Sequence, residues 1–329
     1  MRCWNLLWMG WPKYLSPELA VDYLGIERKK ITRMRTYDLK DLVESDIKVI
    51  VGIPNEQLAI LASDSTVATN WFLQLTKHIS KDKILYIAVG NEAKSTDYDS
   101  VVPAMRNIFF AVNGIDLFDN TFKAAGGDDK IVVKVTTAIS LDLLTTDFIV
   151  PSKASFLDDN VKGYIKNIIA FLNKAANKAP LLANVYPYKA INEKDWNAPF
   201  ALFEPTAQSI NDGDNYVYKN LFDLLLDAFY RALQNISITG LKIVVAETGW
   251  PSVGVPPNSN ANTDNAAKYY RRLIDHIATC DGTPFKPGQP IETYLYAMFG
   301  MNRKDRNQIE PNYGIYTDDG KHKYPGVPE

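Results

Sequence analysis

The chain has 329 residues, of which 46% are hydrophobic, so it can bury the core of one large domain or of two ordinary ones. Its formal net charge is -2, with 36 Lys and Arg against 38 Asp and Glu, so it has no basic excess with which to hold nucleic acid. No stretch of the sequence approaches the roughly 20 apolar residues of a membrane-spanning helix. The composition therefore argues against nucleic acid as a partner and against a membrane span.

Short, β-branched apolar runs alternate with helical patterns along most of the chain. Strands are predicted at Arg2–Met9, Lys30–Tyr37, Ile47–Ile53, Ile84–Gly90, Lys130–Ile139, Pro180–Tyr188, Leu241–Ala246 and Ile291–Phe299. Helices are predicted at Pro17–Leu24, from Asp38 to about Glu44, from near Asp64 to Ile79, at Val101–Val112, over Val161–Leu172, at Asn220–Leu233, and through Tyr270, Ile274 and Ile277 with Thr263 and Asp264 as caps.

Eight buried strands separated by helices predict an α/β fold, namely a closed (β/α)8 TIM barrel that forms a single domain over residues 1–329. Residues of about 189–218 lack a clear period and are too many for an ordinary connection, so we expect a small insertion after strand six, at the rim of the cleft. Within it, Phe200–Phe203 is interpreted as part of an added hairpin. A doubly wound open sheet is the alternative, but no GxGxxG or GxxxxGK loop follows a strand.

Two of the predicted strands run into a glutamate. Glu92 ends the stretch ILYIAVGNE, and Glu247 lies in LKIVVAETGWPSVG. Because the carboxyl ends of barrel strands meet at one rim, we expect the two carboxylates to face each other, about 5 Å apart. Such a pair suits glycoside hydrolysis, in which one acid protonates the leaving oxygen and the other attacks the anomeric carbon. The proton donor then needs a raised pKa, and the nucleophile needs hydrogen bonds that keep it ionised.

Other catalytic chemistries find little support in the sequence. The three histidines, His78, His276 and His322, lie in helical patterns or in the polar tail, which disfavours a Ser-His-Asp triad or a multi-histidine metal site. The cysteines form no CxxC or Cys/His cluster of the zinc-binding kind. We therefore expect no metal and no cofactor. Asn91, next to Glu92, is expected either to bond a sugar hydroxyl near the reacting carbon or to cap the end of its strand.

The chain resembles the plant endo-β-1,3-glucanases of glycoside hydrolase family 17 over essentially its whole length. The stretches that carry the resemblance are VGIPN (Val51 to Asn55), VGNE (Val89 to Glu92), NVYPY (Asn184 to Tyr188), KNLFD (Lys219 to Asp223), VVAETGWPSVG (Val244 to Gly254), GTPFKPGQPIETYLYAMF (Gly282 to Phe299) and IEPNYGIY (Ile309 to Tyr316). The AETGWPS segment is specific to the family, whereas VGNE alone is a weak signal.

The resemblance implies a (β/α)8 barrel, an extended open groove for a linear β-glucan, and hydrolysis with retention of anomeric configuration. It implies that Glu92 is the general acid/base and Glu247 the nucleophile. It also implies contacts with the glucan, or support of the site, by the following residues: Tyr37, Asn184, Tyr186, Trp250, Phe299, Lys304 and Glu310. For Tyr186 and Phe299 the alternative is packing at the barrel rim, and for Lys304 and Glu310 it is a solvated ion pair.

Two departures from the family pattern bear on activity. Where the family usually reads Phe-x-Glu-Asn-x-Lys, this chain has Met301 in place of the acid. That acid lies near the general acid in the family, so its loss is expected to lower the pKa of Glu92 and weaken proton donation at neutral pH. The first strand differs too, and Trp4 and Trp11 either repave the floor of the groove or block a subsite.

Three functions stay open at this stage. The first is an endo-acting, retaining β-1,3-glucan hydrolase, and the second a catalytically impaired glucan-binding relative. The third is a mixed-linkage β-1,3-1,4-glucanase or a transglycosylase. The resemblance further implies a monomer with a role in plant defence, secreted to the cell wall or vacuole, although the start of the chain lacks the small-residue cleavage site of a signal peptide. The sequon at Asn235 permits N-glycosylation in a secreted protein.

Overall fold

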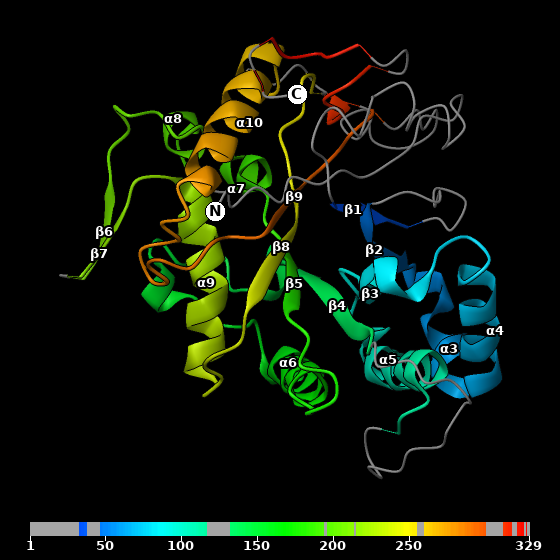
Figure 1. Ribbon diagram of the computed structural model, residues 1–329. Coiled ribbons are helices and arrows are strands. Elements are labelled where there is room, and N and C mark those ends of the chain that lie inside the picture. The colour runs from blue at the N-terminus through cyan, green and yellow to red at the C-terminus, as the bar shows by residue number, and fades with distance from the viewer. Residues whose placement is uncertain are drawn as a thin grey trace.

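The computed structural model describes residues 33–37, 47–116, 132–193, 196–213, 215–254, 260–300, 312–317, 321–325 and 327. In this part of the chain, seven parallel strands form one curved sheet (Figure 1). Their order is β1 (Arg33–Thr36), β2 (Lys48–Ile53), β3 (Ile84–Asn91), β4 (Lys134–Ser140), β5 (Leu181–Asn184), β8 (Ile243–Thr248) and β9 (Thr293–Leu295). Most residues of these strands are buried, as expected for a parallel sheet covered by helices.

The two edges of the sheet approach each other. Near the start of the strands, Arg33 of β1 forms a salt bridge of 2.9 Å with Glu292, which precedes β9. Near their carboxyl ends, Arg35 of β1 reaches Glu247 of β8 at 3.2 Å. A parallel sheet that is nearly closed and surrounded by helices is the TIM barrel predicted from the sequence. The predicted first strand, Arg2–Met9, lies outside the described residues.

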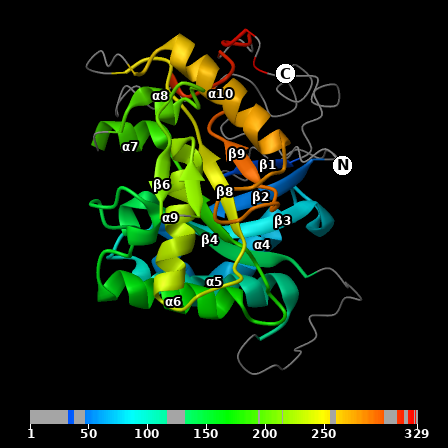
Figure 2. The same ribbon diagram turned by 90° about the vertical axis from the view of Figure 1, so that its left-hand side faces the viewer.

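The helices of the described part pack around the outside of the sheet (Figure 2). They are α3 (Leu58–Ser63), α4 (Ser65–Leu75), α5 (Tyr98–Asn113), α6 (Asp159–Leu172), α7 (Pro187–Glu193), α8 (Ala198–Ala201), α9 (Leu221–Asn235) and α10 (Thr263–Ala278). Side-chain caps set several of their starts. The side chain of Asn262 accepts a hydrogen bond of 2.8 Å from the backbone N–H of Asn265, so it caps α10 in place of the predicted Thr263 and Asp264.

The carboxyl ends of three strands differ from the prediction. β5 ends at Asn184, because the predicted strand runs into Pro187, which lacks the N–H that a sheet needs and opens α7 instead. β8 continues to Thr248, so Glu247 lies inside a strand. β9 holds only three residues, a much shorter strand than the predicted Ile291–Phe299.

The segment between β5 and α9 contains a hairpin, but not where it was expected. Phe200–Phe203 was predicted to form it, and this is wrong, because the side chain of Asn197 caps a helical turn, α8, at that place. The hairpin lies further along the chain, in the antiparallel pair β6 (Ile210–Asp212) and β7 (Tyr216–Tyr218). It projects beside α9 in Figure 1. None of the described helices is long and apolar enough to cross a membrane.

Candidate active site

Glu247 is a buried carboxylate that accepts hydrogen bonds from three side chains. Its Oε1 accepts from Nη1 of Arg35 at 3.2 Å and from the hydroxyl of Tyr37 at 2.5 Å. Its Oε2 accepts from the hydroxyl of Tyr186 at 2.8 Å. Burial, together with the charge of Glu247, raises the pKa of both tyrosines well above the usual value, so they remain donors. Charge-assisted bonds of this kind are short and strong, and they fix the orientation of the carboxylate.

Arg35 ties Glu247 to the neighbouring strands. Its side chain is fully buried on β1. Besides Glu247, Nη1 donates to the carbonyl oxygen of Ala246 at 3.1 Å and to Oδ1 of Asn184 at 3.4 Å, and Nη2 donates to Oδ1 of Asn91 at 2.9 Å. An unpaired buried guanidinium is costly, so these partners explain how β1 tolerates a cation at this position. The guanidinium therefore joins the ends of β1, β3, β5 and β8.

Glu92 follows β3 with a backbone angle φ of 50°, in the left-handed region that favours glycine. Its own N–H donates to the carbonyl oxygen of Ala138 at 2.9 Å. The preceding residue, Asn91, is held by the side chain of Asn55. Oδ1 of Asn55 accepts from the N–H of Asn91, and Nδ2 donates to the carbonyl oxygen of Asn91, both at 2.8 Å. A non-glycine residue persists in this conformation when its surroundings fix it, and such residues are common at functional sites.

The surroundings of Glu92 favour its protonated form. Burial comes first, and the charge of Glu247 adds to it, so the pKa of Glu92 is raised above its usual value. Asp142 acts in the same direction, whereas Lys189 and the hydrogen bond from Asn184 act against it. That hydrogen bond runs from Nδ2 of Asn184 to Oε1 of Glu92 at 2.6 Å. A carboxyl group with a raised pKa is suited to giving up a proton during a reaction.

A short chain of polar contacts therefore connects the two glutamates. It leads from Glu92 through Asn184 and Arg35 to Glu247. Asn184 also pairs in register with Glu247, because β5 and β8 are neighbours in the sheet. The two carboxyl groups thus lie at the same rim of the barrel, as the sequence predicts, and they have different hydrogen-bond partners.

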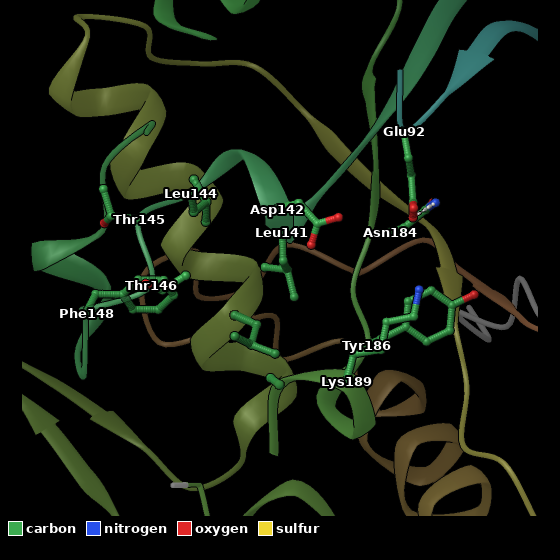
Figure 3. Close-up of a pocket in the computed structure, with 12 residues that line it drawn as sticks. Glu92, Leu141, Asp142, Leu144, Thr145, Thr146, Phe148, Asn184, Tyr186 and Lys189 are labelled. Atoms are coloured by element: carbon green, nitrogen blue, oxygen red, sulfur yellow. Dashed lines mark hydrogen bonds between the residues drawn. The ribbon is translucent and has the colours of Figure 1, made fainter. Parts of the chain in front are cut away.

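A pocket opens beside Glu92 (Figure 3). Asn184, Tyr186 and Lys189 lie at its Glu92 end, and Thr145 and Phe148 lie at the other. The remaining lining residues are Leu141, Asp142, Leu144, Thr146, Ala190 and Leu225. Apolar walls with a few convergent polar groups are typical of a small-molecule site.

Two aromatic residues that the resemblance assigned to the glucan are buried away from this pocket. Trp250 is fully buried, its Nε1 donates to the carbonyl oxygen of Asn260 at 2.7 Å, and its ring packs on Tyr188 and Tyr269 with centroids 5.3 Å apart in each case. Phe299 is only 1% exposed. Neither ring presents a face to a ligand, so the structure gives both a packing role.

The remaining expectations divide in two. The structure brings Tyr37, Asn91, Asn184 and Tyr186 together around the glutamates. Lys304, Glu310 and the substituted position Met301 lie outside the described residues, as do Trp4 and Trp11. Among the residues that the structure describes, no three His, Cys, Asp or Glu side chains gather as metal ligands would.

Sequence reasoning missed Arg35, Asn55, Asp142 and Lys189 as parts of the site. For Arg35 a signal existed, because Arg33, Arg35 and Tyr37 alternate along one face of a strand in the stretch RMRTY. A charged residue on a buried strand needs a partner, and that partner was Glu247. The other three follow strands, where polar residues are common and carry no signal of their own.

Comparison with known proteins identifies the family of the chain. Residues 20–325 match the family model "Glycosyl hydrolases family 17". A glucan endo-1,3-beta-glucosidase of Vitis vinifera is 41% identical over 307 residues, which cover 89% of this chain and 83% of the relative. The glucan endo-1,3-beta-glucosidase A of Solanum lycopersicum is 38% identical and covers 91% and 84%.

Solved structures are similar over the same length. CJP38, a beta-1,3-glucanase and pollen allergen of Cryptomeria japonica, matches with a TM-score of 0.83 at 31% identity, covering 99% of this chain and 98% of its own. One of two plant beta-glucan endohydrolases with distinct substrate specificities matches with a TM-score of 0.79 at 32% identity, covering 98% and 100%. The chain is a glycoside hydrolase and belongs to glycosyl hydrolases family 17.

Proposed function

We propose that the protein cleaves internal β-1,3 linkages of a linear β-glucan with retention of anomeric configuration. The curated relatives carry the name glucan endo-1,3-beta-glucosidase, at identities of 41% and 38% over most of both chains. The surroundings of the two glutamates support the mechanism, because retention requires one ionised and one protonated carboxyl group on either side of the scissile bond.

In the first step, a carboxylate oxygen of Glu247 attacks the anomeric carbon as the bond to the leaving sugar oxygen breaks. Glu92 transfers its proton to that oxygen, so the shortened glucan departs as an alcohol and Glu247 is left as a glycosyl ester. Hydrogen bonds from Arg35, Tyr37 and Tyr186 hold the attacking carboxylate in one orientation. The raised pKa of Glu92 keeps its proton available.

In the second step, Glu92 is a carboxylate and removes a proton from a water molecule. The resulting hydroxide attacks the same anomeric carbon, releases Glu247, and restores both groups to their starting protonation states. We propose that Asn184 stabilises the carboxylate that Glu92 becomes after the first step, because its Nδ2 donates to Oε1 at 2.6 Å and that bond favours the ionised form. The geometry expected for this mechanism is a carboxyl separation of about 5 Å.

One observation supports the proposal most strongly, namely the contrast between the two glutamates at one rim. Glu247 has three donors. Among the residues that the structure describes, the side chain of Glu92 accepts from the one donor Asn184, and its pKa is raised. When two nearby carboxyl groups have such different environments, the one with the raised pKa is the acid and the other is the nucleophile. Here these are Glu92 and Glu247.

Release of reducing ends from laminarin tests this function, with Glu247→Gln as the control for contaminating activity. The expected result is release by the wild type and none above background by the variant, with internal fragments as early products. Barley-type mixed-linkage β-glucan distinguishes a β-1,3-glucanase from a β-1,3-1,4-glucanase. Products from that polymer but not from laminarin would indicate the second. Binding of laminarin without products from either polymer would indicate the impaired glucan-binding relative.

We further propose that the chain acts as a monomeric, single-domain enzyme over residues 1–329 and is secreted. The matches to solved glucanases cover 98–99% of the chain, which supports one catalytic domain. Asn235 of the sequon ends α9 on the exposed surface, where an oligosaccharide could attach. Sedimentation at equilibrium tests the monomer, and the electrophoretic shift of the plant-expressed protein after endoglycosidase treatment tests passage through the secretory route.

A further inference from the structure

Two oppositely charged side chains line the pocket beside Glu92, and the two catalytic steps above do not use them. Lys189 comes from the first turns of α7, and Asp142 from the turn that follows β4 (Figure 3). Both residues are exposed, so neither is an internal packing residue. Glu92, Asp142 and Lys189 therefore share one solvent-accessible space.

The position of Lys189 is restrained by the catalytic residues themselves. Its Nζ lies 4.6 Å from the centroid of the Tyr186 ring, at the distance of a cation–π contact. The same tyrosine donates to Glu247 at 2.8 Å. Pro187 opens α7 between the two residues, so the backbone that carries Lys189 starts at a fixed place beside the site. The ammonium is thus anchored at the rim rather than free in solvent.

We propose that Lys189 and Asp142 are positioning residues that set the pH range of catalysis by acting in opposite directions on Glu92. This inference rests on the proposed function, in which Glu92 must hold a proton to act. It means that the charges of Lys189 and Asp142, and not those of the two glutamates alone, set the pH above which activity falls.

Charged groups from several elements face Glu92, and their signs decide the direction. Glu247 of β8 and Asp142 after β4 raise the pKa of Glu92, behind the larger effect of burial. Lys189 of α7 lowers it, as does the hydrogen bond from Asn184. The guanidinium of Arg35 and the hydroxyls of Tyr37 and Tyr186 are engaged by Glu247. Lys189 and Asp142 are therefore the members of this set that can be changed without removing a partner of Glu247.

Removing the positive charge with Lys189→Met should raise the pKa of Glu92 and move the alkaline limb of the kcat/KM profile on laminarin to higher pH. Removing the negative charge with Asp142→Asn should move the same limb to lower pH. Above the wild-type midpoint we expect relative activities that differ from wild type by about two- to fivefold, upward for the first variant and downward for the second, the size typical of a charge pair near the surface. Both displacements should shrink in 1 M salt, because these groups are open to solvent.

Two further variants serve as controls. Lys189→Arg keeps the charge and should keep the wild-type limb. Lys77→Met removes an exposed lysine at the end of α4, remote from the pocket, and should leave the limb unchanged. A change of KM with an unmoved limb in both pocket variants would mean that the two residues only contact sugar, and would overturn the proposal. Limbs that move in the same direction would overturn it as well.

A second readout keeps this inference separate from the proposed function. The carboxyl carbon of Glu92 can be titrated by 13C NMR, assigned by its loss in Glu92→Gln. If laminarin is not cleaved, the proposed function fails. The titration still tests the present inference, which requires a higher midpoint in Lys189→Met and a lower one in Asp142→Asn.

Discussion

Asn55 binds both backbone polar groups of Asn91, accepting from its N–H and donating to its carbonyl oxygen at 2.8 Å in each case. The two bonds form a clasp between the end of β2 and the end of β3. They fix Asn91, the residue immediately before Glu92. The φ of 50° at Glu92 is unfavourable for a residue other than glycine unless its surroundings hold it. The orientation of the proposed acid therefore depends on a side chain that never touches it.

Replacing the clasp should reduce catalysis more than binding. In Asn55→Ala, the buried N–H and carbonyl of Asn91 lose their partners, at a cost of about 1–3 kcal/mol in unfolding free energy. We expect a lower kcat on laminarin with little change in KM, because Glu92 loses its fixed direction. Asn107→Ala is the matched control, since Asn107 donates to the carbonyl oxygens of Leu61 and Ala62 at a helix end away from the site. If both variants lose the same stability and the same kcat, the clasp has no specific role.

Replacing Glu92, the proposed acid, should slow the reaction more when the leaving group needs a proton to depart. Glu92→Gln cannot donate a proton, so kcat/KM on laminarin should fall by about 10²–10⁴-fold. A dinitrophenyl β-glucan oligosaccharide needs no protonation of its leaving group, so its first step should be affected far less. Stopped-flow release of dinitrophenol measures this step. An equal loss on both substrates would contradict the assignment of Glu92 as the acid.

The hydroxyl of Tyr186 should contribute to the reactivity of the nucleophile. Tyr186→Phe removes one of the three donors to Glu247 while keeping the ring that Lys189 contacts. A hydrogen bond to a charged group is worth about 1.5–3 kcal/mol, which corresponds to a loss of about 10- to 150-fold in kcat/KM. Steady-state kinetics on laminarin check this, with circular dichroism to confirm the fold. Wild-type kinetics in the variant would show that the remaining donors suffice.

A buried aspartate on α9 should make stability depend on pH. Asp227 is fully buried and accepts hydrogen bonds from the hydroxyls of Tyr218 and Thr283 and from the backbone N–H of Phe285. These contacts join the inserted hairpin to α9 and to the segment before β9. Burial raises the pKa of Asp227 to about 7.

Because the pKa of Asp227 is higher in the folded than in the unfolded chain, its protonated form favours folding. The stabilisation is fully present below the ordinary aspartate pKa of about 3.9 and is lost as the pH rises through about 7. Urea unfolding from pH 4 to pH 8 should show a steeper decline for the wild type than for Asp227→Asn, which cannot titrate. Parallel declines in the two proteins would contradict the shifted pKa.

The sequence predicts the strands well and their contacts poorly. The runs at Ile47–Ile53 and Ile84–Gly90 appear as β2 and β3 almost unchanged, because uninterrupted β-branched and apolar residues specify a strand buried on both faces. The end of β9 differs, because the hydrogen bonds that extend or stop a strand come from its neighbours. Local periodicity carries no information about them.

The site shows the same division. Glu92 and Glu247 could be found because each follows an apolar run in a family-like segment. Arg35 lies 212 residues from Glu247 in the chain, and only the curvature of the sheet brings them together. Trp250 was assigned to the glucan through the family resemblance. An aromatic ring suits both a sugar platform and a core position, and the burial of Trp250 distinguishes the two roles.

The central claim is that Glu247 attacks the sugar while Glu92 supplies and recovers a proton. The most direct measurement is the anomeric configuration of the first product, followed by 1H NMR in the first minutes of laminarin hydrolysis, before the anomers equilibrate. The account predicts that the new reducing end appears as the β-anomer and that Glu247→Gln produces none. Initial appearance of the α-anomer would mean direct attack by water, and would contradict the assignment of Glu247 as the nucleophile.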